Sequence, residues 1–194
     1  MSADAISAAG DLLSGLGVCV GLFFAWQQLS SWKLQTISNK RAEVAEEALL
    51  AAYQFDDALR ILRSRFKRYY LEEGETSDVA ARRYLAERLK LLGERQADLR
   101  RAQIRARAVL DSDDLDKEID ILTDIAVETR LAHESLIEPV NRPMSIDERE
   151  LVDIRRIAYG SYDEKDALGV RQIEALGRIK KILRPLIAHG ESIK

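Results

Sequence analysis

The sequence is poor in the residues that build most catalytic and metal centres. Its only cysteine is Cys19, so no disulfide can form within one chain. Its two histidines, His133 and His189, are far apart in the chain, and each lacks a neighbouring set of metal-binding side chains. The motifs HExxH, CxxC, GxxxxGK[ST] and GxSxG are all absent. We therefore expect no metal ion, no cofactor and no catalytic activity.

One acidic run, Asp111 to Asp116, has the look of a calcium-binding loop. Such a loop needs glycine at its sixth position and glutamate at its twelfth. Asp116 and Leu122 stand there instead, so the match fails. We expect these carboxylates to cap a helix and to interact with the positive end of its dipole.

Turn-forming residues are scarce: the 194 residues include only 3 prolines and 10 glycines. No stretch shows the alternation of apolar and polar residues that is typical of a strand. Charged residues make up 32% of the chain, yet the net charge is only −3, which indicates no strongly electrostatic partner for the chain as a whole. The composition predicts an all-α protein with long helices.

The stretch from Ala5 to Trp26 is nearly free of charge and rich in glycine and alanine. As a helix it would be about 33 Å long, which matches a hydrocarbon core of about 30 Å. Trp26 and Trp32 stand where interfacial aromatic anchors are expected. We predict a single transmembrane helix here, in preference to a signal peptide or to a buried helix of a soluble protein.

The flanks of this stretch predict its orientation. No basic residue precedes it, whereas Lys33, Lys40 and Arg41 follow it. The positive-inside rule then places the N-terminus outside and the rest of the chain in the cytoplasm, at the inner membrane of a bacterium.

Two features within the predicted span bear on its role. Gly17, Gly21 and Ala25 are spaced by four residues, so they form one smooth stripe through which two copies could associate. Asp11 is a carboxylate inside an apolar segment, where a charge is costly. It either reaches the outer headgroups or faces the interior of an oligomer, and the sequence leaves both open.

Beyond the anchor (residues 1–32) we predict a cytoplasmic, coiled-coil-like antiparallel bundle of four to five helices. Residues 33–73 would form a stalk and a first helix that ends near Leu71. Residues 74–138 would form a hairpin of a basic and an acidic helix lying side by side with opposed charge. Residues 139–194 would form a helical pair, with a capping box at Ser145 and a last helix over 163–187 that Pro185 kinks or frays.

The segment WKLQTISNKRAEVAEEALLAAYQFDDALRILRSRF, residues 32–66, combines a Trp-Lys pair, an AEEAL helix start and an aromatic-x-x-Asp-Ala pattern before a basic tail. It resembles a loose bacterial family of single-pass, membrane-anchored helical proteins. The resemblance covers the juncture alone, so it implies a topology and attaches no activity.

The leading functional hypothesis is a membrane-tethered, non-enzymatic scaffold or adaptor that binds itself and, in some settings, another protein. The alternative is an oligomeric membrane effector, a pore or ion-conducting assembly in which Asp11 lines the path and the bundle acts as a sensor. A third reading, a nucleic-acid tether through the arginines of residues 82–107, is disfavoured because few aromatic residues accompany them.

Overall fold

The computed structural model describes residues 3–64, 72, 74–137, 147–160 and 166–191, without the side chains of residues 3–16, 19 and 189–191. Over these ranges the chain is all-α and contains no strand, which confirms the all-α part of the predicted fold. The helices are α1 (Ala3–Arg63), α2 (Ser77–Leu110), α3 (Asp113–Ile137), α4 (Glu148–Ala158) and α5 (Ala167–Glu191).

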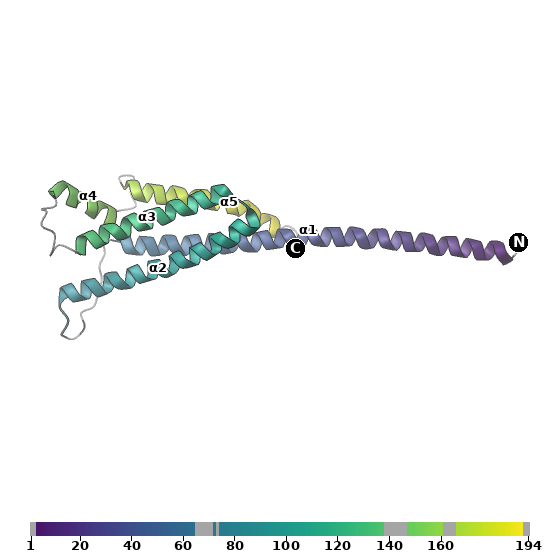
Figure 1. Cartoon of the computed structure of the whole chain (residues 1–194), viewed down its shortest axis with the longest axis horizontal. Coiled ribbons are helices and arrows are strands. Elements are labelled where there is room, and N and C mark those ends of the chain that lie inside the picture. Colours follow the sequence, from purple (N-terminus) through teal and green to yellow (C-terminus); the bar gives the residue numbers. More distant parts are fainter. Residues whose placement is uncertain (1–2, 65–71, 73, 138–146, 161–165, 192–194) are drawn as a thin grey trace.

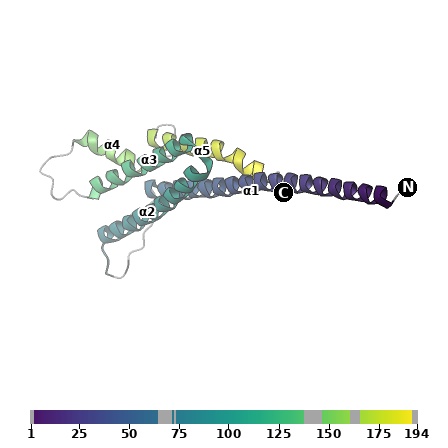
Figure 2. The ribbon, with the colours of Figure 1, turned by 45° about the vertical axis from the view of Figure 1, so that its right-hand side comes forward.

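Helix α1 is the axis of the molecule (Figure 1). Its C-terminal part packs against α2 and α5, while α3 packs against α5 and α4. Its N-terminal part extends beyond the bundle as a lone helix, in both views of the ribbon (Figures 1 and 2). Among the described side chains of α1, the first buried one is Ala42. The bundle therefore begins near residue 42.

The core is built on an apolar stripe along α1, where steps of three and four residues from Ala45 to Leu62 predict one face of a helix. Phe55, Leu59 and Leu62 of that stripe are buried against neighbouring helices. Much of the same face is alanine, which has no bulk beyond Cβ and lets neighbouring backbones approach closely: Ala42, Ala45, Ala48, Ala51, Ala52 and Ala58 are all buried. Small and large side chains thus alternate along the central helix, as close packing requires.

Helices α2 and α3 form a hairpin, but their charges pair differently from the prediction. Arg105 of α2 reaches Glu47 of α1, and Arg107 pairs with Asp116 of α3 at 2.6 Å. The acidic face of α3 turns mainly toward α5, where Arg171 and Arg178 contact its glutamates. This pairing of charges follows from the packing of the helices. Helix α2 packs mainly on α1 and α3 packs mainly on α5, so α2 and α3 contact each other little.

Several helix ends differ from the sequence-based expectation. Helix α1 ends at Arg63 and not near Leu71, and residues 65–71 lie outside the described residues. The predicted cap Ser145 also lies outside them; Asp147 caps α4, and its side chain accepts a hydrogen bond from the Arg149 amide. Helix α5 continues through Pro185 to Glu191, so the proline does not end it.

Within the described residues, no helix contains a stretch that is both long and apolar enough to cross a membrane. The span predicted at Ala5–Trp26 is therefore not supported by the structure and stays a prediction. Residues 5–26 do belong to α1, but the side chains of residues 5–16 are outside the description.

A buried ion pair ties the ends of three helices together. The Arg63 guanidinium donates from Nη2 to both carboxylate oxygens of Asp166, at 2.8 and 2.7 Å, and from Nε to the Ile157 carbonyl at 3.3 Å. Both side chains are buried. Gly160 leaves the space that they fill, because a Cβ at that position would collide with both. The pair thus fixes the end of α1 against α4 and α5.

We predict that Asp166→Asn lowers the free energy of unfolding by about 3–5 kcal/mol, because it leaves the Arg63 charge buried without its anionic partner. The matched control is Arg171→Met on α5, which removes a surface ion pair with Glu128 of α3 and is expected to cost about 0–1 kcal/mol. Urea unfolding of the full chain measures both. Equal losses in the two variants would contradict this account of the buried pair.

Candidate functional site

The part of α1 outside the bundle is the candidate interaction site, and we call residues 17–41 the projecting segment. None of its described side chains is buried. This is unusual for such a sequence, because the segment contains many of the chain's largest apolar residues. Those with the greatest exposure are Val18, Val20, Leu22, Phe23, Phe24, Trp26, Leu29, Trp32, Leu34 and Ile37.

These apolar residues surround the helix and do not form one stripe. At about 100° per residue, Val18, Phe23 and Phe24 point in three different directions. A surface helix of a globular protein carries its apolar residues on one face, and a helix that is apolar all round belongs in a core or in lipid. A single partner helix could therefore cover only part of the apolar surface.

The predicted association residues lie four apart on one face of α1 and add no bulky side chain to it. Gly17, Gly21 and Ala25 are all exposed and follow one another along that face. A Cβ added at Gly17 or at Gly21 would meet no atom within 4 Å, so no described part of the chain covers these two glycines. Asp11 lies within α1, but its side chain is outside the description, and its predicted role stays a prediction.

The two predicted interface anchors are exposed. Trp26 keeps 67% and Trp32 62% of its surface accessible, and neither belongs to the bundle core. The Phe23 ring lies 6.5 Å from the ring of Trp26, so the aromatic residues cluster at one level of the helix. Nearby hydroxyls turn back to the backbone: Ser30 donates to the Gln27 carbonyl and Thr36 to the Trp32 carbonyl. Such bonds satisfy a hydroxyl without water.

Charge on the projecting segment has one sign. Between Asp11 and Glu43 the sequence contains no acidic residue, while Lys33, Lys40 and Arg41 lie toward the bundle. A cationic collar next to an apolar helix is the arrangement that anionic lipid headgroups attract.

Comparison of the chain with protein-family models, with curated proteins and with solved structures finds no match. The resemblance of residues 32–66 to membrane-anchored helical proteins therefore stays a prediction. Any function has to be argued from the geometry of this chain alone.

The bundle buries several polar groups. His133, which lies on the stripe that predicts the inner face of α3, is 1% exposed, and its ring meets Tyr159 edge to face at 4.9 Å. His189 has its side chain outside the description. Among the described residues no three His, Cys, Asp or Glu side chains are grouped as a metal site would require.

A second polar tie joins α1 to α5. Asp56 is buried and accepts a hydrogen bond from the Gln172 side-chain amide at 2.6 Å. It also forms an ion pair with Arg60 at 2.8 Å. Burial raises the pKa of the Asp56 carboxyl, while the contacts with Gln172 and Arg60 oppose that shift. Sequence periodicity could not have found this contact, because its partners are 116 residues apart.

We predict that the difference in the free energy of unfolding between the wild-type chain and Asp56→Asn depends on pH. A carboxyl with a raised pKa in the folded state binds a proton more readily there than in the unfolded state, so its contribution to stability grows as pH falls toward the unfolded pKa. Relative to the wild type, Asp56→Asn is thus expected to have its highest free energy of unfolding at neutral pH. This difference should become smaller as the pH is lowered.

Urea unfolding at a series of pH values measures that difference. Asp153→Asn, which changes an exposed carboxylate on α4, is the control and should alter stability by less than about 0.5 kcal/mol throughout. An Asp56→Asn advantage that grows as the pH falls would show that the shift has the opposite sign.

Proposed function

We propose that this chain is a membrane-tethered helical scaffold, without catalytic activity, that self-associates at the inner face of a bacterial membrane. The observation that carries the proposal is the projecting segment, whose apolar side chains lie exposed all round α1. Burying one Val, Leu or Phe side chain gains about 1.5–3 kcal/mol, so covering this segment is worth on the order of 10 kcal/mol.

Lipid is the cover that fits this distribution. A second helix contacts one face of its partner, whereas lipid surrounds a helix. The described apolar part of the segment, up to Trp26, continues the stretch that begins at Ala5 and contains one charged residue, Asp11, and together they match the thickness of a bilayer. The cations Lys33, Lys40 and Arg41 would then lie on the cytoplasmic side with the bundle.

The proposed self-association rests on the stripe of small residues along α1. In lipid, helices associate mainly through close backbone packing, which small residues permit. Gly17, Gly21 and Ala25 supply such a face, and no part of the described chain covers the two glycines. Two copies could meet there while lipid covers the remaining sides.

The unbroken helix makes the tether stiff. Between Gly21 and Arg63 the sequence has neither glycine nor proline, and α1 runs continuously through this interval. From Trp26 to the first bundle residue, Ala42, the helix rises about 24 Å. The bundle would therefore stand at a set distance from the membrane, where its surface is available to another protein.

We predict that the full chain floats with lipid vesicles in a density gradient and resists extraction by high salt. A chain beginning at Lys40 should remain in the soluble fraction. Val18→Arg should reduce vesicle binding, because a charge near the middle of a span costs about 2.5–3.5 kcal/mol. The matched control is Ile37→Arg, which changes another exposed β-branched residue of the same helix and should bind normally.

Equal behaviour of Val18→Arg and Ile37→Arg, or full-length protein that stays soluble without lipid or detergent, would overturn the membrane proposal. Ion leakage from the vesicles that Asp11→Asn abolishes would favour the effector alternative over the scaffold.

We also predict that Gly21→Leu weakens association between chains in vesicles by roughly tenfold, which corresponds to 1.4 kcal/mol. The added side chain would hold two backbones apart. Val20→Leu, on a different face of the same turn, is the control and should associate as the wild type does. Energy transfer between labelled chains measures both; unchanged association in Gly21→Leu would remove this stripe from the interface.

A further inference from the structure

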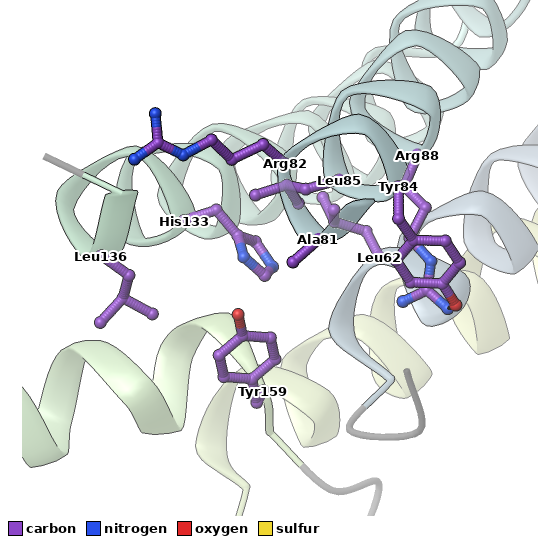
Figure 3. A pocket seen from close by; sticks show the side chains of 9 residues that line it. All are labelled: Leu62, Ala81, Arg82, Tyr84, Leu85, Arg88, His133, Leu136 and Tyr159. Carbon is purple, nitrogen blue, oxygen red and sulfur yellow. Dashed lines mark hydrogen bonds between the residues drawn. The ribbon is translucent and has the colours of Figure 1, made fainter. Parts of the chain in front are cut away.

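Helices α2 and α3 leave a groove between them on the outside of the bundle, because α2 packs on α1 and α3 packs on α5. At Gly93 and Gln103 of α2 and Asp120 of α3 the groove is an open hollow of about 430 Å³. At the end remote from the projecting segment it widens into a cavity of about 150 Å³, where the His133 ring faces the hydroxyl end of Tyr159 (Figure 3). In both ribbon views the start of α2 stands away from the end of α3 there (Figures 1 and 2).

The two walls of the groove run antiparallel, and two contacts fix how they are aligned. The Gln103 side-chain amide donates to Asp120 at 3.2 Å, and Arg107 pairs with Asp116 at 2.6 Å. Each residue of an α-helix rises by the same distance, so counting back along α2 and forward along α3 from these contacts finds the residues that lie at one height along the bundle.

The face that α2 presents beside the groove has cations at its ends and small residues between them. Its members follow at steps of three and four residues, so they share one side of the helix, and all are exposed: Lys90, Gly93, Ala97 and Arg100. A Cβ at Gly93 would meet no atom within 4 Å. The described part of the chain thus gives no packing reason for this glycine, although glycine weakens the interior of a helix.

The face that α3 presents beside the groove has carboxylates at its ends and bulky apolar residues between them. Its members also follow at steps of three and four residues, and all are exposed: Asp120, Asp124, Val127, Leu131 and Glu134. Leu131 keeps 53% of its surface accessible. In charge and in size, this face is the complement of the face on α2.

Most of these charges have no ionic partner within the described part of the chain. Arg100 donates to the neutral side chain of Gln103 at 2.7 Å, and Asp120 accepts from the same side chain. Among the described residues, Lys90 and Asp124 form no ion pair. A partner of a single sign would be attracted by one helix and repelled by the other. A partner that fits both walls must itself carry a basic and an acidic helix.

We propose that this partner is a second copy of the chain, with α2 of each copy lying on α3 of the other. The inference rests on the proposed membrane tether, which holds both copies in the same direction. A two-fold axis along the membrane normal exchanges the two helices without changing their height, so one surface serves both copies. This surface is separate from the stripe at Gly17, Gly21 and Ala25, and the two contacts can be removed one at a time.

The heights of the residues bring opposite charges together across such a contact. Arg100 of one copy comes level with the turn between Asp120 and Asp124 of the other. Lys90 of the first copy comes level with Glu134 of the second. Complementary charges of this kind fix the register of an interface and disfavour other partners.

The same alignment brings small residues opposite bulky ones. Ala97 of one copy comes level with Val127 of the other, and Gly93 comes level with Leu131. The bulky side chains can then enter the hollow beside the small ones, as close packing of two surfaces requires. A second copy therefore supplies the reason for Gly93 that the described part of one chain does not.

The test is energy transfer between labelled full chains in vesicles, all carrying Gly21→Leu so that the stripe contributes little. Arg100→Glu alone and Asp124→Arg alone place like charges at both contacts of a two-fold pair, so each should associate at least roughly tenfold more weakly. In a mixture of the two variants, one contact has its charges exchanged and the other is unchanged. Mixed pairs should therefore form as well as the parent does, and pairing within one chain cannot produce that rescue.

The matched control is Lys181→Glu, which reverses an exposed charge on α5 and should associate as the parent does. Lys90→Glu mixed with Glu134→Lys is a second pair of variants with the same expected result. It decides the question if a variant of the first pair fails to fold.

Parent-like association in both single variants, or no rescue in their mixture, would overturn the proposal. So would the loss of all association in Gly21→Leu itself. Flotation of the same vesicles reports membrane attachment separately. Chains that float but show no rescue contradict this contact alone, whereas chains that do not float contradict the proposed tether.

Discussion

The structure depends on one constraint: α1 is a single uninterrupted helix of 61 residues. At 1.5 Å per residue it is about 92 Å long, far more than a bundle of this size can bury. Its C-terminal part is the surface on which α2 and α5 assemble, whereas no described side chain of its N-terminal part, up to Arg41, is buried. The function of the chain therefore depends on what covers the N-terminal part of α1.

The bundle is held to α1 by two different means. Apolar packing along an alanine-rich face sets how closely the helices approach. Two buried polar ties, Arg63 with Asp166 and Asp56 with Gln172, then set where along α1 the last helix lies. A shift of α5 along α1 by one turn would keep most apolar contacts but leave charged groups buried without partners. In this chain the polar ties thus contribute chiefly to the register between helices.

Sequence periodicity predicted the helices and most of the core, since a stripe with steps of three and four is a local signal. The steps along the acidic helix predict an inner face of Leu115, Ile119, Leu122, Ala126, Thr129, His133 and Leu136; the first six are buried and Leu136 is half-buried. In the last helix the same steps predict an inner face of Val170, Ile173, Leu176, Lys180, Leu183 and Ile187. Ile173, at 48%, and Lys180 are exposed instead, while Gln172 is buried and reaches Asp56. A long-range contact decided that outcome, and periodicity within one helix carries no information about it.

The same limit explains why the cavity could not be predicted. The sequence indicated a basic and an acidic helix joined by a short loop, from which side-by-side pairing was the natural expectation. Yet each helix has a stronger alternative: α2 meets the alanine face of α1, and α3 meets α5. Close packing on those neighbours draws α2 and α3 apart, so His133 and Tyr159 border a space instead of a filled core. The alanines of α1 thus account both for the tight centre of the bundle and, at its far end, for the opening between its second and third helices.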